Sequence, residues 1–202
     1  MTTTKTLPAL NIDLPPGFTG MPVSDDEELN LRTAWAISQR VASAAGKTPE
    51  EFGGYLVSLV PAMRRTNIRV FGKFAVGDGP EFLATLTLAL VPFPATGPLE
   101  SVAGALADIY RRRHPQAEVR LVDLPAGPAM AAIEGGEFRL PPELTGNAVE
   151  EVRTQIKAMY QIPWPDGGSV VMLSVIAESE QAWPAVAEAT ARIAHSLRRA
   201  PR

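Results

Sequence analysis

The sequence contains no cysteine, only two histidines and no long apolar run. Without cysteine, the chain forms no disulfide and has no thiolate nucleophile and no cysteine-based zinc or iron–sulfur site. Its histidines, His114 and His195, lie far apart in the chain, whereas a transition-metal site usually draws on a closely spaced pair. No segment approaches the roughly 18 consecutive apolar residues that a membrane-spanning helix needs. We therefore expect no metal ion, no cofactor and no insertion into a membrane.

Basic residues are also fewer than acidic ones, with 19 Lys and Arg against 22 Asp and Glu and a net charge of −3 at pH 7. Nucleic-acid binding needs a basic face that displaces counterions, so this balance argues against a nucleic-acid partner. The start of the chain, MTTTKTLP, contains one lysine and no apolar segment, unlike a secretory signal peptide. Together with the absence of cysteine, which suits a reducing compartment, this predicts a cytoplasmic protein.

The spacing of apolar residues predicts one domain with a lead-in. Residues 1–23 are rich in proline and show no period, so we expect an extended segment that is either disordered or laid across the domain. Residues 24–202 form a single α+β domain in this interpretation. Within it, residues 24–65 contribute two extra helices as an N-terminal elaboration, and residues 67–199 form the core.

Both N-terminal helices have recognisable starts. A capping-box match at Ser24–Glu27 opens the first helix, and apolar residues then recur at helical spacing, among them Leu31 and either Ala34 or Trp35. Thr48 opens the second helix, followed by a proline at the first helical position and a glutamate that completes the capping box. The apolar positions form one stripe on each helix, which is the side that an amphipathic helix turns toward a core.

From Asn67 onward the apolar period changes to two, which indicates strands. The alternation predicts about six strands, at residues 67–76, 82–91, 119–122, 129–133, 152–162 and 170–177. Glycine-rich turn signals at Gly77–Gly79 and Asp166–Gly168 each separate two consecutive strands. Because strands joined by tight turns run in opposite directions, we expect an antiparallel sheet.

Other segments complete the order. Gly135–Gly136 is a further turn signal, and residues 138–150 have the pattern of an irregular connection. A helix of about 15 residues follows Pro98, and Ser179 to Arg199 form the last helix. The predicted order is ααββαββββα, so the fold class is α+β, an antiparallel sheet flanked by helices.

Two turn motifs carry a resemblance to a known fold. Residues 117–129 (AEVRLVDLPAGPA) form a hairpin motif, and residues 161–168 (QIPWPDGG) join two long strands. Together they resemble a group of actinobacterial proteins and the PsbP-like fold superfamily, which includes a photosystem oxygen-evolving subunit, a Ran-release factor, the Lpq lipoproteins and the Eag-type effector chaperones. The resemblance covers about residues 67–199. It implies a non-catalytic chaperone, adaptor or accessory subunit, although the lipoproteins' lipid-attachment cysteine is absent here.

Candidate binding residues lie near turns and helix ends, where bulky aromatic and arginine side chains could anchor a protein partner. They are Trp164, Trp183, Phe93, Arg111, Arg112 and Arg113. As an alternative, the aromatic side chains fold inward at the edge of the core. The arginines then complement the dipole at a helix C-terminus.

The sequence has no GxSxG nucleophile motif, no Walker motif and no GxGxxG before a helix, so we expect no catalytic residues and no enzyme. Our main hypothesis is a protein-binding module, such as a chaperone, adaptor or immunity-type protein of a secretion or contact-competition system. One alternative is a small-molecule-binding protein or hydrolase with a cleft between the sheet and the N-terminal helices, using Glu134, Glu137, Tyr160 and His114. Another is a structural subunit of a larger assembly, with residues 1–23 as an arm; the oligomeric state stays open.

Overall fold

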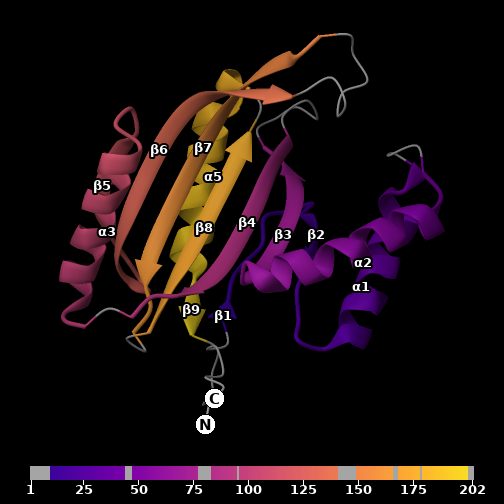
Figure 1. Ribbon diagram of the computed structural model, residues 1–202, viewed down its shortest axis with the longest axis horizontal. Coiled ribbons are helices and arrows are strands. Elements are labelled where there is room, and N and C mark those ends of the chain that lie inside the picture. Colours follow the sequence, from indigo (N-terminus) through magenta and orange to yellow (C-terminus); the bar gives the residue numbers. More distant parts are fainter. Residues whose placement is uncertain are drawn as a thin grey trace.

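The computed structural model describes residues 10–43, 47–76, 83–94, 96–140, 149–165, 168–177 and 179–199. This part of the chain is a mixed α+β fold with four α-helices and a seven-stranded antiparallel sheet (Figure 1). The helices are α1 (Glu27–Val41), α2 (Pro49–Arg65), α3 (Leu99–Arg113) and α5 (Trp183–Ser196). The strands, in spatial order, are β2 (Thr19–Pro22), β3 (Ile68–Ala75), β4 (Leu83–Pro92), β8 (Ser169–Ala177), β7 (Glu151–Pro163), β6 (Gly127–Leu140) and β5 (Glu118–Leu124).

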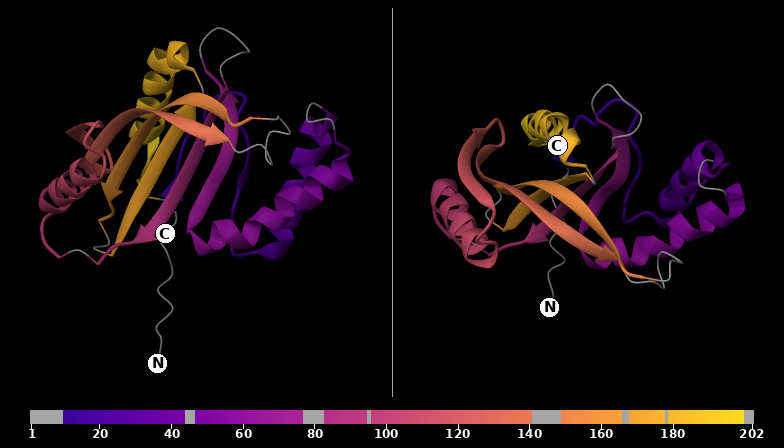
Figure 2. Two further views of the ribbon diagram at one scale, coloured as in Figure 1. Left: turned by 45° about the horizontal axis from the view of Figure 1, so that its top comes forward. Right: turned by 90° about the horizontal axis from the view of Figure 1, so that it is seen from above.

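Helices cover both faces of the sheet, with α5 on one face and α3 on the other (Figure 2). Successive residues of a strand point to opposite faces, and β6 shows the consequence. Its Ala129 joins the main core with Val186 of α5, whereas its neighbour Met130 joins a second core with Leu106 of α3. The sheet is therefore apolar on both faces, in agreement with its long apolar strands.

A third core joins the N-terminal helices to the edge of the sheet. Ala34 and Ile37 of α1 and Val60 of α2 pack with Met21 of β2, and Phe71 of β3 lies against them. The helical pair projects to one side of the sheet, away from α3 and α5 (Figures 1 and 2). Because β2 precedes this pair and β3 follows it, the two helices are an insertion between adjacent strands of the sheet.

The two ends of the described chain also meet. β1 (Leu10–Asn11) pairs with β9 (Arg198–Arg199), and the backbone N–H of Asp13 donates to Ser196 Oγ at 2.9 Å. The lead-in from residue 10 is thus extended and lies against the domain, while residues 1–9 fall outside the described chain.

The prediction of six strands is wrong, because the sheet has seven. The additional strand, β2, comes from the segment taken as a lead-in, and its Gly20 pairs with Gly72 of β3. The turn predicted at Gly135–Gly136 is also wrong, since both glycines lie within β6, opposite Ile156 and Gln155 of β7. The start of the predicted irregular connection is wrong as well, because β6 continues to Leu140; residues 141–148 fall outside the described chain.

Capping residues set the helix starts, and two predicted helix boundaries differ from those in the structure. Thr48 caps α2 through the complete capping box that the sequence predicts. The start of α1 is capped instead by Asp26, whose carboxylate accepts from the Leu29 N–H, so the cap predicted at Ser24 is wrong by two residues. The last helix is shorter than predicted, because the short 3₁₀ turn η2 (Glu180–Ala182) precedes α5 and β9 follows it. The predicted turn at Gly77–Gly79 lies outside the described residues, as do the first two residues of the predicted turn at Asp166–Gly168.

Candidate functional site

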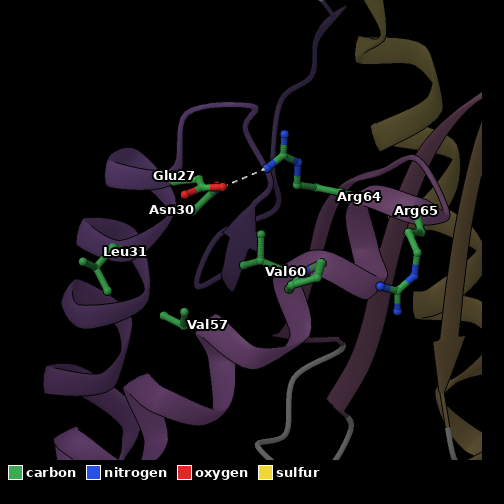
Figure 3. Close-up of a pocket in the computed structure, with 8 residues that line it drawn as sticks. Glu27, Asn30, Leu31, Val57, Val60, Arg64 and Arg65 are labelled. Atoms are coloured by element: carbon green, nitrogen blue, oxygen red, sulfur yellow. Dashed lines mark ion pairs between the residues drawn. The ribbon is translucent and has the colours of Figure 1, made fainter.

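One candidate for binding is a cleft between α1 and α2, which we call the helical cleft. Its volume is about 490 Å³. Leu31 of α1 and Val57, Val60 and Pro61 of α2 form its apolar wall, and Glu27 and Arg64 lie at its rim (Figure 3). The third core closes the cleft from behind, since Val60 is buried against it.

The rim of the helical cleft consists of ion pairs. Arg64 lies 3.7 Å from Glu27 and 3.8 Å from Asp25, and Asp25 also lies 3.6 Å from Arg69. The carboxylates are largely exposed, so each pair contributes at most about 1 kcal/mol to stability. The result is an apolar centre within a charged border, as in the binding patches of protein interfaces.

Asn30 also lines the helical cleft but is already engaged. It is 4% exposed, and its side chain accepts from the Ser24 N–H and donates to the Ser24 carbonyl, both at 2.8 Å. These two bonds hold the segment before α1 in place. Asn30 therefore positions the cleft wall, and its amide is not a free group for a ligand.

Several large apolar side chains of the helical pair stay exposed. Leu31 is 44% exposed and Trp35, one turn later on the same face of α1, is 36% exposed. Tyr55 of α2 is 54% exposed. The buried side of α1 is formed instead by Ala34, Ile37 and Ser38, so the stripe expected from the sequence lies partly in solvent.

A second polar arrangement lies where α3 ends over β6 and β7. Glu134 accepts from Lys157 Nζ at 2.7 Å through one oxygen and lies 2.9 Å from His114 Nδ1 through the other. The His114 ring stacks on Tyr110 at 4.3 Å, and Lys157 Nζ lies 3.4 Å from the Tyr110 hydroxyl. We call these four residues the Glu134 cluster. It joins the C-terminal end of α3 to two strands of the sheet.

The electrostatics of the Glu134 cluster favour the ionised carboxylate. Burial raises the pKa of Glu134, but hydrogen bonds from Lys157 and Tyr110 and the nearby His114 outweigh burial, so the pKa is lowered overall. Burial first, and then the charge of Glu134, raise the pKa of Tyr110. Both oxygens of Glu134 are thus occupied by groups of the chain itself, as in a structural ion pair.

Two residues of the predicted hydrolase site lie on the other face of the sheet. Glu137 is three positions from Glu134 on β6 and therefore on the opposite face, and Tyr160 packs against the main core. Burial raises the pKa of Tyr160. Of the four residues, the structure brings together only His114 and Glu134. The sequence analysis did not identify Lys157 as a member of this cluster. The pairing of β6 with β7 places Lys157 opposite Glu134.

The chemistry open to the Glu134 cluster is limited. Glu134 could orient the His114 ring as a general base, with Nε2 directed to a substrate. Among the described residues, however, no hydrogen bond joins Nε2 of His114 to a hydroxyl. The same part of the chain holds no group of three His, Asp or Glu side chains that could bind a metal ion.

The predicted aromatic anchors are largely covered. Trp164 is 2% exposed in the main core, so it is not available as a surface anchor, and its indole N–H has no hydrogen-bond partner among the described residues. Trp183 is half-buried against the same core, and Phe93 is half-buried against the core under α3. The apolar content of the nearby strands draws these side chains inward, as in the alternative of a core edge.

The arginine run ends α3. Arg111 forms an ion pair with Asp108 at 3.0 Å and donates to the Val119 carbonyl of the edge strand β5 at 3.2 Å. Arg112 and Arg113 are exposed in the last turn, where cations complement the helix dipole. The structure does not bring this run together with the aromatic residues or with the helical cleft.

Comparisons with known proteins give a distant likeness. Comparisons with protein-family models and with curated proteins found no match. A comparison with solved structures found the crystal structure of LpqN, involved in cell envelope biogenesis of Mycobacterium tuberculosis. The alignment covers 98% of this chain and 87% of that one, with 12% identity and a TM-score of 0.49. The PsbP-like resemblance remains a prediction from the turn motifs. In addition, none of the described helices is long and apolar enough to cross a membrane.

Proposed function

We propose that this protein is a non-catalytic protein-binding module whose helical cleft holds a bulky apolar side chain of a protein partner. The observation that carries the proposal is the apolar wall of the cleft, bordered by ion pairs and one turn from the exposed Trp35. A fold that needed the helical pair only for stability would turn Leu31 and Trp35 into the core, because burying each side chain is worth about 1.5–3 kcal/mol.

The partner is a protein in this proposal because the apolar surface extends beyond the helical cleft. Trp35 enlarges it one turn beyond Leu31 on α1, whereas a small-molecule site encloses most of its ligand. A central pocket for one anchor within a charged border is the usual arrangement of an interface hot spot. A role as chaperone, adaptor or immunity-type protein is what the turn-motif resemblance implies, and it belongs to the same proposal.

The experiment compares two leucines of α1 in the full chain. Leu31 and Leu29 are 44% and 43% exposed, but only Leu31 lines the helical cleft. Tagged wild-type protein, Leu31→Glu and Leu29→Glu are purified from the native host at low salt, and co-purifying proteins are identified and quantified. The folds of the variants are checked by circular dichroism and thermal melting.

We expect one stoichiometric protein partner with the wild type and with Leu29→Glu, and its loss with Leu31→Glu. An unpaired carboxylate buried at the centre of an interface costs about 2–5 kcal/mol in binding, which suffices to release a partner of micromolar affinity. Equal recovery by both variants, or no stoichiometric partner for the wild type, would contradict the proposal.

A further inference from the structure

The carboxylates at the rim of the helical cleft are already paired within the chain, whereas one of the arginines is not. Glu27 lies 3.7 Å from Arg64, and Asp25 lies between Arg64 and Arg69 at 3.8 and 3.6 Å. Arg65 also lines the cleft, but its side chain forms no ion pair or hydrogen bond with any described residue. In this set of five residues, three arginines face two carboxylates, so the rim keeps a positive charge without a counter-charge.

The end of α2 does not need Arg65 as a cap. Arginines in the last turn of a helix often complement its terminal carbonyls. Here the Thr66 hydroxyl donates to the carbonyls of Ala62 and Met63 at 3.0 and 3.1 Å. The N–H of Asn67, a residue in the left-handed conformation, donates to the carbonyl three positions earlier. The chain therefore satisfies these carbonyls with its own donors, and the Arg65 side chain stays available.

Arg65 follows the apolar wall along α2. Val57, Pro61 and Arg65 are spaced by four residues, which places them in one row on the same side of the helix. Arg65 lies about 6 Å along the helix axis from Pro61. Its side chain lies apart from the Glu27–Arg64 pair (Figure 3). A partner segment that covers the wall and continues along α2 therefore meets this arginine next.

Charge complementarity selects the group that the partner brings to this position. A guanidinium binds a carboxylate through two parallel hydrogen bonds. Glu27 and Asp25 would attract a cation, but each already faces an arginine, so the net charge of the rim disfavours one. A neutral group would remove water from Arg65 without compensating its charge, which is costly. A carboxylate is thus the group that fits.

We propose that the helical cleft binds a segment of the protein partner that places an apolar side chain on the wall and an Asp or Glu carboxylate on Arg65. This inference rests on the proposed function and specifies the chemistry of the partner. The distance of about 6 Å between Pro61 and Arg65 matches side chains two residues apart in an extended segment or four apart in a helix.

The probes for the test are acetyl-Leu-Ser-Asp-amide and acetyl-Leu-Ser-Asn-amide, which have nearly the same shape and differ in one charge. Each is titrated into full-length protein with labelled Leu and Val methyl groups, and NMR reports the shifts of Leu31, Val57 and Val60. We expect both peptides to shift these methyl signals and the acidic peptide to bind about five-fold more tightly at low salt, as for a partly exposed ion pair. About 0.5 M NaCl should remove most of this preference, because salt screens such a pair.

Two variants assign the preference to its residue. Arg65→Gln should abolish it. Arg32→Gln is the matched control and should keep it, because Arg32 is an exposed arginine of α1 that pairs with Glu28 at 4.0 Å and does not line the cleft. Equal affinities for the two peptides, or a preference that survives Arg65→Gln, would overturn the role of Arg65. Methyl signals that neither peptide shifts would overturn the position of the apolar side chain.

These outcomes are distinguishable from failure of the proposed function. The comparison of Leu31→Glu with Leu29→Glu tests binding of the protein partner without reference to a carboxylate. Loss of the partner with Leu31→Glu, together with equal affinities for the two peptides, would overturn this inference and support the proposed function.

Discussion

Replacement of Glu134 by glutamine should destabilise the protein through the Glu134 cluster. The side chains of Glu134 and Lys157 are 22% and 20% exposed, so their ion pair at 2.7 Å is mostly shielded from solvent. Glutamine keeps the shape and one acceptor oxygen but removes the charge that both Lys157 and His114 contact. Lys157 is then left as a largely buried ammonium without a counter-charge.

The size of the effect follows from two contacts. A hydrogen bond to a charged group contributes about 1.5–3 kcal/mol, and the remaining acceptor of glutamine retains part of one bond. We expect a loss of about 2–3 kcal/mol in the free energy of unfolding, which is roughly 5–10 °C in melting temperature for a chain of this length. Glu137→Gln is the matched control. Glu137 lies on the same strand but is exposed, so its replacement should change stability by less than about 0.5 kcal/mol.

The loss should also depend on pH. The pKa of Glu134 in the folded protein is lower than its ordinary value of 4.5, so the ionised carboxylate stabilises the fold above that value. As the pH falls through the folded pKa, the carboxylate takes up a proton and the advantage of the wild type disappears. The difference between wild type and Glu134→Gln should therefore be complete at pH 7 and shrink below about pH 4.5.

Urea unfolding of wild type, Glu134→Gln and Glu137→Gln at pH 7 and at acid pH measures both effects. A loss for Glu134→Gln as small as that for Glu137→Gln, or one that stays the same in acid, would refute the account of this cluster. Adding Lys157→Met to Glu134→Gln should cost little more, because the energy of the pair is already lost.

Three further substitutions test the fold, each read as a change in the free energy of unfolding by urea or heat. Gly72→Ala should destabilise by about 1–3 kcal/mol, since its methyl group would collide with the paired backbone of Gly20 and with the Phe18 ring; a neutral result would contradict the β2–β3 pairing. Gly54→Ala should stabilise by about 0.5–1 kcal/mol, because a methyl group there meets open space on α2. Arg198→Ala should cost less than about 1 kcal/mol, since its pair with Asp13 at 2.8 Å is exposed, and a larger loss would mean that the ends of the chain stabilise the domain more than their contacts suggest.

The sequence predicted correctly those helix starts and strands that depend only on interactions between residues close together in the chain. The Thr48 capping box and the long alternation of β4 and β8 need only neighbouring residues, and the structure has the capped α2 and both strands where the sequence puts them. β2 was not predictable in this way. Its residues, TGMP, have little strand propensity, and what holds them is the close approach of Gly20 to Gly72, about 50 residues further along.

The misassigned turn at Gly135–Gly136 has a similar cause. Two glycines usually mark a turn, but here strand β7 pairs with β6 from Met130 to Leu140 and keeps both glycines in the strand. The Glu134 cluster depends on the same register, because Lys157 reaches Glu134 only across that pairing. The sequence made Glu134 and His114 candidates for one site, but it did not indicate that Lys157 pairs with Glu134.

The helical cleft was the least predictable feature. Helical periodicity placed Leu31 and either Ala34 or Trp35 on the apolar stripe of the first helix, and a stripe alone does not tell whether it faces a core or a partner. The packing of Ala34 and Ile37 against β2 decides this, because it turns Leu31 outward. The sequence did contain one signal, Pro61, which breaks the local rule for a helix interior.

The most direct test of the central claim is site-specific photo-crosslinking at two adjacent positions of α2. Val57 lines the helical cleft, whereas Ser58 is exposed and points about 100° further around the helix. With p-benzoylphenylalanine at either position, we predict a crosslink to one protein partner from position 57 and little or none from position 58. Equal yields from both positions, or capture only from an unrelated surface such as Leu121 on the edge strand β5, would contradict the account.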